Sequence, residues 1–204
     1  MEDMKKAAPF ISYLLHPLLM PSLGLLIILN SGTYLSLLDP AAKRAIIFVL
    51  ALGTLVFPLM MLPILHFRSL VARNGQAATR EERLVPQIII LILYIITFIY
   101  FKKLPLSQII HAYVLSVTGT LFIVLALNLK FRVSLYTAAL GGLTGLIIAL
   151  IFLYETPLEG LLMLSIFAGG LSGSSRMAQG EGWGAVLSGF LLGLAVVLGT
   201  ILLY

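Results

Sequence analysis

Basic and hydroxyl residues gather in three short polar stretches that interrupt an otherwise apolar sequence. The stretches read TREERLVP at 79–86, KFRVS at 130–134 and SGSSR at 172–176. Guanidinium groups bind phosphate oxygens through paired hydrogen bonds, and a lysine adds a point charge. If the three stretches meet in space they form a cradle for a phosphate group, and the residues that we expect to bind it are Arg80, Arg83, Lys130, Ser134, Ser175 and Arg176.

Four further side chains could transfer protons or attack phosphorus beside such a cradle, namely His16, His66, Tyr136 and Glu181. Each has a competing structural interpretation. The two histidines suit the lipid headgroup level, and Glu181 suits an ion pair with Arg176. A tyrosine with its ordinary pKa of about 10 is a poor acid at neutral pH. The catalytic residues are therefore unknown from these residue types alone, with these four as candidates.

Metal and cofactor chemistry have no support in the residue pattern. The chain has no cysteine, and its three histidines, His16, His66 and His111, lack the close spacing of metal ligands. We expect neither a metal nor a cofactor. His111 is expected at the opposite end of the molecule from the three polar stretches, as a residue whose hydrogen bonding is satisfied within a helical bundle.

The composition places these residues in a membrane protein. Hydrophobic residues make up 60% of the 204 positions and charged residues only 10%, against about 25% charged residues in soluble domains. Membrane-spanning segments must be helices or a closed barrel, because lipid satisfies no unpaired backbone group. Long unbroken apolar runs predict an all-α bundle, since barrel strands would appear as short alternating segments.

Seven apolar runs are each close to the ~20 residues that cross a bilayer. They predict one integral membrane domain, residues 1–204, with six to seven spans. The sixth run is the least secure, because Gly169, Gly170 and Gly173 interrupt it, and we expect it to be short or broken at membrane depth. The predicted spans are Phe10–Leu29, Ala45–Leu65, Leu84–Tyr100, Ile109–Leu129, Val133–Leu153, Pro157–Gly173 and Trp183–Tyr204.

Glycines in the fifth and last runs offer small faces for helix contact. Gly141, Gly142 and Gly145 lie in the fifth run, and Gly189 and Gly193 lie in the last. Small residues allow helix backbones to approach closely in membranes. These glycines therefore predict close helix packing rather than a site.

With seven spans, the three polar stretches share one membrane face with the amino terminus. The opposite face carries four basic residues, Lys43, Arg44, Lys102 and Lys103, out of 13 in the chain, so 13 − 4 leaves nine on the face with the stretches. The positive-inside rule then places that face in the cytoplasm. The charges of a phosphate cradle weaken this argument, and the membrane side of the cradle stays open.

The order and content of the three stretches resemble the integral-membrane type 2 phosphatidic acid phosphatase superfamily, in particular its compact bacterial and archaeal branch. The opening run ISYLLHPLLMPSLG at 11–24 is similar to the start of that branch. The three family motifs are similar to REERLVP at 80–86, with two residues inserted after Arg83, to KFRVSLYTAALGGLTG at 130–145 and to SSRMAQGEGWGAVLSGFLLG at 174–193. The resemblance covers nearly the whole chain and implies the family's helical membrane fold.

Two positions depart from the family pattern where its chemistry resides. The resemblance implies that a third-motif histidine attacks phosphorus and that a second-motif histidine protonates the leaving group. Here Tyr136 stands at the second-motif position, and Gly182, or Glu181 if one residue has been deleted, stands at the third-motif position. Val186 falls where an acid or amide would orient the missing histidine. We expect the family's chemistry to be absent or severely reduced.

These observations support three functions. The leading hypothesis is a phosphatase-fold protein that binds the phosphorylated or pyrophosphorylated headgroup of a membrane lipid and is catalytically degenerate. The second is an active lipid phosphate phosphatase or phosphotransferase with relocated catalytic residues. The third is a small lipid or solute transporter, which a broken sixth span would permit.

The expected partners and location follow from the same pattern. Membrane lipids are the expected partners, and nucleic acid is not, because the basic residues form no soluble basic face. We expect a multi-pass protein of the bacterial plasma membrane, that is, the inner membrane. The family usually works on the outer face of that membrane, which conflicts with the charge count.

Overall fold

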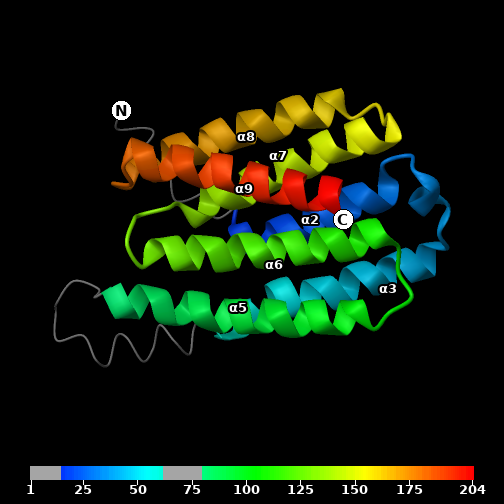
Figure 1. The fold of residues 1–204 in the computed structure, drawn as a ribbon, viewed down its shortest axis with the longest axis horizontal. Coiled ribbons are helices and arrows are strands. Elements are labelled where there is room, and N and C mark those ends of the chain that lie inside the picture. The colour runs from blue at the N-terminus through cyan, green and yellow to red at the C-terminus, as the bar shows by residue number, and fades with distance from the viewer. Residues whose placement is uncertain (1–14, 62–79) are drawn as a thin grey trace.

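The computed structural model describes residues 15–61 and 80–204, apart from the side chains of 80–83, and all regular elements within these residues are helical (Figure 1). The prediction of an all-α chain is confirmed. In chain order the elements are η1 (Pro17–Leu19), α2 (Met20–Asn30), η2 (Tyr34–Leu37), α3 (Pro40–Ala51), η3 (Leu52–Val56), α5 (Arg80–Lys102), α6 (Gln108–Asn128), α7 (Leu135–Tyr154), α8 (Glu159–Ala178) and α9 (Trp183–Leu203).

Five helices within the described residues are long and apolar enough to cross a membrane, which indicates a membrane protein. They correspond to the second, third, fourth, fifth and seventh predicted spans, and their bounds are Pro40–Met61, Leu84–Lys102, Gln108–Asn128, Leu135–Tyr154 and Trp183–Leu203. The first predicted span, Phe10–Leu29, appears as a shorter apolar helix, Pro17–Asn30, and the start of this predicted span lies outside the described residues.

The sixth predicted span differs from the expectation. The prediction that it is short or broken at its glycines is wrong, because α8 is continuous over 20 residues. Gly169 and Gly173 lie inside the helix, where a β-carbon would approach the side chains of Phe190 and Val186 closely. These glycines allow α8 to pack beside α9 instead of breaking it. The serines and arginine in its last two turns make α8 less apolar than its neighbours.

The second predicted span begins earlier than expected and contains a π-helical segment. Asp39 caps the start of α3, where its carboxylate accepts hydrogen bonds from the amides of Ala41 at 2.9 Å and Ala42 at 3.3 Å. Pro40 occupies the first helical position, which suits a residue without an amide hydrogen. The π segment η3 follows directly and presents the carbonyl of Thr54 to the hydroxyl of Tyr94 on α5 at 3.2 Å.

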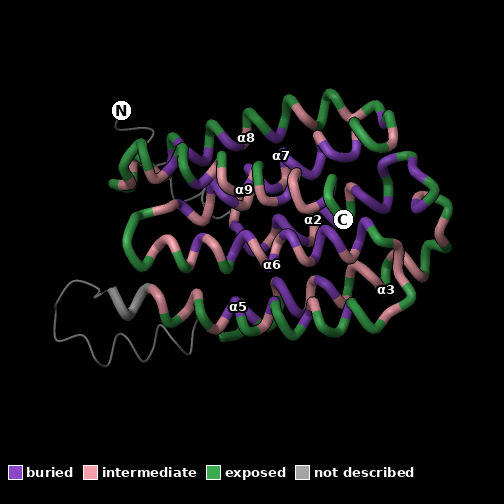
Figure 2. The backbone as a smooth tube through the Cα atoms, viewed as in Figure 1, coloured by how far each residue is buried: buried purple, intermediate pink, exposed green. Residues whose placement is uncertain are grey.

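Helix α7 lies at the centre of the bundle and packs most extensively against α9, then against α8. It carries an almost continuous buried surface (Figure 2). Helix α6 packs against α5 and α9, and α2 packs against α3, α6 and α7. Helix α8 lies along one edge, where most of its contacts are with α7.

The contact between α7 and α9 confirms the predicted glycine packing. A β-carbon at Gly193 would lie 2.7 Å from the carbonyl carbon of Ala138 and 2.9 Å from the amide nitrogen of Gly142. A β-carbon at Gly145 would lie 2.7 Å from the carbonyl oxygen of Leu194. The contacts advance along both helices in the same direction, so α7 and α9 are parallel neighbours whose backbones touch.

Candidate anion-binding site

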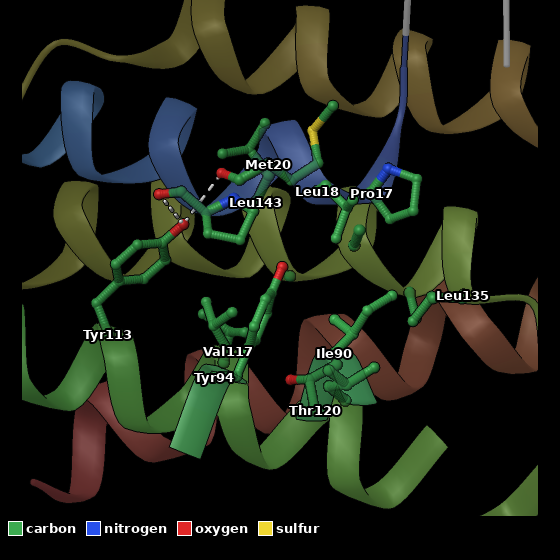
Figure 3. Close-up of a pocket in the computed structure, with 16 residues that line it drawn as sticks. Pro17, Leu18, Met20, Ile90, Tyr94, Tyr113, Val117, Thr120, Leu135 and Leu143 are labelled. Atoms are coloured by element: carbon green, nitrogen blue, oxygen red, sulfur yellow. Dashed lines mark hydrogen bonds between the residues drawn. The ribbon is translucent and has the colours of Figure 1, made fainter. Parts of the chain in front are cut away.

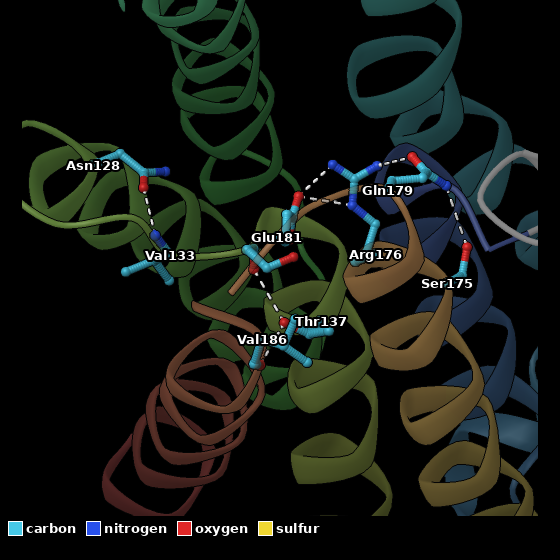
Figure 4. Close-up of polar contacts among 9 residues, drawn as sticks. Asn128, Val133, Thr137, Ser175, Arg176, Gln179, Glu181 and Val186 are labelled. Atoms are coloured by element: carbon cyan, nitrogen blue, oxygen red, sulfur yellow. Dashed lines mark hydrogen bonds and ion pairs between the residues drawn. The ribbon is translucent and has the colours of Figure 1, made fainter. Parts of the chain in front are cut away.

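One end of the bundle brings together several of the predicted site residues. The α7 amino terminus, the α8 carboxy terminus, the connection from α8 to α9 and the start of η1 lie at this end (Figures 1 and 4). They carry, respectively, Tyr136, Arg176, Glu181 and His16, and contacts described below link these four side chains. We call these four residues the Arg176 cluster.

The guanidinium of Arg176 is held from three directions. Its Nε donates to Oε1 of Glu181 at 2.8 Å, and one Nη also donates to that oxygen (Figure 4). The other Nη donates to Oε1 of Gln179 at 2.9 Å. The guanidinium carbon lies 4.3 Å from the centroid of the Tyr136 ring, which is the geometry of a cation–π contact.

These bonds leave part of Arg176 available to an anion. A guanidinium has five N–H groups, and the described residues accept from three of them. The side chain is 20% exposed and that of Glu181 25% exposed, so the pair lies at the rim of the bundle. The expected ion pair between the two residues is present, and an incoming anion must share or displace the Glu181 carboxylate.

His16 contacts Tyr136 on this end of the bundle. The two ring centroids are 5.7 Å apart at an interplanar angle of 77°, an edge-to-face arrangement. Nδ1 of His16 accepts a hydrogen bond from the amide of Leu18 at 3.3 Å and caps η1. Only the neutral ring can accept at Nδ1, so its proton is on Nε2. His16 lies outside the five candidate spans. Burial lowers its pKa, which also favours the neutral ring.

Three buried oxygens near the Arg176 cluster have no hydrogen-bond partner among the described residues. They are Oγ of Ser134, Oγ of Ser172 and Oε2 of Glu181. Ser134 is the N-cap of α7 and is 3% exposed, yet its hydroxyl does not cap the helix. Such groups are costly to leave unpaired. The two serine hydroxyls are therefore available to water or to the oxygens of a bound headgroup, whereas the Glu181 oxygen can only accept from a donor such as water.

Ser175 and Gln179 belong to the same network. Nε2 of Gln179 donates to Oγ of Ser175 at 3.3 Å while its Oε1 accepts from Arg176 (Figure 4). Ser175, a predicted phosphate-binding residue, is 2% exposed, and its hydroxyl accepts the hydrogen bond that positions the Gln179 side chain. Gln179 was missed by the sequence analysis, although its spacing of three and four residues from Arg176 and Ser175 on a helix was a usable signal.

The remaining predicted residues do not join the described cluster. Lys130 lies on the exposed turn after α6 at the same end of the bundle, and its side chain forms no hydrogen bond or ion pair with any residue that the structure describes. Arg80 and Arg83 lie in the first turn of α5, and their side chains, like the whole of His66, lie outside the described residues. Their predicted roles stay predictions.

His111 is confirmed as a satisfied bundle residue. Its Nε2 lies 3.0 Å from the carbonyl oxygen of Phe101, away from the Arg176 cluster. Among the residues described, no three histidine, aspartate or glutamate side chains group together as metal ligands would. The Arg176 cluster can form hydrogen bonds to an anion and neutralise its charge.

Comparison of the chain with known proteins identifies no family. No family model, no curated protein and no solved structure matches the chain. The resemblance to the type 2 phosphatidic acid phosphatases therefore depends on the sequence motifs alone.

Proposed function

We propose that this chain binds the phosphate or pyrophosphate headgroup of a membrane lipid at the Arg176 cluster and releases little or no phosphate. The proposal includes membership of the type 2 phosphatidic acid phosphatase superfamily and a place in the bacterial plasma membrane. The observation that carries it is the guanidinium of Arg176, which lies against Tyr136 and Gln179 and from whose five N–H groups the described residues accept only three bonds.

The surroundings of Arg176 support phosphate binding in two further ways. Lys130 and Arg132 lie on the exposed connection between α6 and α7 at the same end of the bundle and add positive charge there. The unpartnered hydroxyl of Ser134 can donate a hydrogen bond to a phosphate oxygen. A headgroup at the rim of the helices would reach these groups while its apolar part stays within the membrane.

Weak or absent turnover is proposed from the side chains that the described residues place beside the guanidinium. Tyr136 occupies the position where the family carries its proton-donating histidine, and its ring lies against Arg176. Among the described residues, Glu181 is the carboxylate that contacts Arg176, and its Oε1 is already engaged by that guanidinium. A bound phosphate would thus be held and neutralised without a prepared nucleophile.

A second function has one specific observation in its favour. His16 contacts the ring of Tyr136, so a histidine is adjacent to the side chain that replaces the family's acid. An active phosphatase could use His16 in place of that acid. The transporter hypothesis loses its motivation, because α8 is continuous where a broken span was expected.

The test compares phosphate release with lipid retention. Detergent-purified protein is incubated with phosphatidic acid, phosphatidylglycerol phosphate or polyprenyl pyrophosphate, and released phosphate and protein-bound lipid are both measured. We expect no release above background and about a tenfold loss of retention in Arg176→Ala, since charge-assisted hydrogen bonds contribute about 1.5–3 kcal/mol.

The matched control is Arg44→Ala, which removes the same charge from the opposite end of the bundle, where Arg44 donates to the carbonyl of Pro40 and to no other described residue. Retention should be unchanged in this variant. Equal loss in both variants would show that binding follows net charge and would refute the proposed site. Phosphate release that disappears in Arg176→Ala and His16→Ala would replace the binding function by the phosphatase.

A further inference from the structure

The exposed aromatic residues of the described bundle are sorted by type along its length. The rings that carry a polar atom lie at the two ends, with Trp183 at the first residue of α9 and three exposed tyrosines at the opposite end. Exposed phenylalanines, which carry no polar atom, also occur along the helices. The tyrosines are Tyr34, Tyr100 and Tyr204, and phenylalanines along the helices include Phe48, Phe122 and Phe167.

The polar atoms of these end rings need partners outside the described residues. The indole N–H of Trp183 and the hydroxyls of Tyr100 and Tyr204 form no hydrogen bond with any residue that the structure describes. A polar group without a partner is costly in hydrocarbon. At the headgroup level of a bilayer, water and lipid oxygens supply the partners, and tryptophan and tyrosine are enriched there.

Polar groups between the two ends are satisfied within the protein. Inside the bundle, the hydroxyl of Tyr113 donates to the carbonyls of Met20 at 3.2 Å and Pro21 at 3.1 Å (Figure 3). On the outside, Ser174 and Ser188 each donate to a carbonyl of their own helix, at 2.9 Å and 3.3 Å. An exposed hydroxyl that is bonded to its own helix can face lipid without an unpaired donor.

Charged side chains are divided in the same way as the polar rings. A charge inside hydrocarbon is costly, whereas lysine and arginine near a helix end reach the headgroup region. All charged side chains that the structure describes belong to the connections or the terminal turns of the helices. The tyrosine end carries Asp39, Lys43, Arg44, Lys102, Lys103, Glu155 and Glu159, and the tryptophan end carries Lys130, Arg132, Arg176 and Glu181.

The distance between the two ends matches a bilayer. Helix α9 has 21 residues from Trp183 and therefore measures about 31 Å, against ~30 Å for the hydrocarbon core. Tyr204 directly follows its last residue. Ile201, in the last turn, packs in one core cluster with Phe101 and Ile109, so Tyr204 lies at the same end of the bundle as Tyr100.

We propose that the two ends of the bundle are the surfaces that contact the two headgroup regions of a bilayer, and that the Arg176 cluster lies at headgroup depth in one leaflet. Trp183 marks this depth, because Glu181 precedes it by two residues and is paired with Arg176. The depth rests on the polar rings, the charges and the helix length. Only the use of a lipid phosphate as the ligand rests on the proposed function.

The experiment uses the fluorescence of Trp183, which is the single tryptophan of the chain. The full chain is placed in phosphatidylcholine bilayers whose acyl chains carry bromine near the headgroup, at mid-chain or at the chain end, and quenching by the three lipids is compared. We expect the strongest quenching by bromine near the headgroup. The depth calculated from the three values should be about 15 Å from the bilayer centre, half of the hydrocarbon thickness.

Two double variants move the reporter along the bundle. Trp183→Phe combined with Phe167→Trp places the indole on the exposed face near the middle of α8. Its calculated depth should shift by about 15 Å toward the bilayer centre, with bromine at the chain end as the strongest quencher. Trp183→Phe combined with Tyr204→Trp should restore the wild-type order of quenching. The wild-type measurement needs no substitution and decides the depth of Trp183 if a variant does not fold.

The result that would overturn the inference is Trp183 quenched most strongly by bromine at the chain end, or not quenched by any of the three lipids. The second result would place the indole in water or against a protein partner. Equal depths for the reporters at 183 and 167 would also overturn it.

The proposed function is tested separately, because these bilayers need contain no phosphatidic acid. The depth of Trp183 should be unchanged in Arg176→Ala. Headgroup depth without Arg176-dependent lipid retention would refute the proposed function alone. Arg176-dependent retention with Trp183 away from the headgroups would refute the present inference alone.

Discussion

Replacing Gly193 by alanine should separate the two central helices. The new β-carbon would lie 2.7 Å from the carbonyl carbon of Ala138, whereas ordinary contacts begin at 3.4 Å, so α7 and α9 must move apart by at least 0.7 Å. The obstacle is backbone, which cannot rotate away as a side chain can. Overpacking of this kind costs about 1–3 kcal/mol, and we expect a loss toward the upper end of that range.

The assay is reversible unfolding of the purified protein in mixed micelles by increasing sodium dodecyl sulfate, followed by circular dichroism. Gly199→Ala on the same helix is the control, because no atom lies within 4 Å of a β-carbon there. This change should be neutral or stabilise by up to about 1 kcal/mol through helix propensity. If both variants unfold at the same detergent fraction, the backbone contact between α7 and α9 does not limit stability and the reasoning is wrong.

Three further predictions concern the polar contacts. Glu181→Gln should raise phosphatidic acid retention about tenfold, because the carboxylate that competes for Arg176 is replaced by a neutral amide. Vesicle flotation measures this retention, and an unchanged value would show that Glu181 does not compete with the lipid. Ser165→Ala removes the 3.1 Å hydrogen bond to Thr144 and should lower the free energy of unfolding by about 0.6 kcal/mol in the detergent assay, with no change contradicting a stabilising role. Burial holds the pKa of His16 below its unfolded value, so the wild type should lose stability as the pH falls below about 6.5. The variant His16→Gln should lack this part of the pH dependence. Identical profiles of melting temperature against pH for the two proteins would exclude the effect.

Much of the helical framework could be predicted because apolar length alone specifies a spanning helix. The start of α3 was placed five residues late, since Lys43 and Arg44 obscured the capping signal of Asp39 and Pro40. The π segment η3 had no local signal. The segment contacts helix α5, where the hydroxyl of Tyr94 donates to a carbonyl of η3.

The candidate site was predictable in its members but not in its contacts. The pairing of Arg176 with Glu181 was foreseen as a structural alternative, because five residues across a helix end bring the two charges together. The contact of Arg176 with Tyr136 was not, because it depends on how α8 is rotated against α7. The rotation of a helix depends on its packing against other helices, as at Gly173 against Val186. It therefore cannot be predicted from the sequence of one segment.

The parallel course of α7 and α9 has a consequence for the topology of the chain. Two parallel neighbours need the segment between them to travel back over their whole length, and α8 with its 20 residues measures about 30 Å, one hydrocarbon thickness. In a bilayer that α7 and α9 both cross, α8 is thus the return crossing, although its composition alone is too polar to indicate one. Its buried serines, among them Ser165 and Ser172, are shielded from lipid by neighbouring helices. Helix α8 therefore depends on a partner that is made before it, and membrane insertion of α8 should be efficient only when α7 is already present.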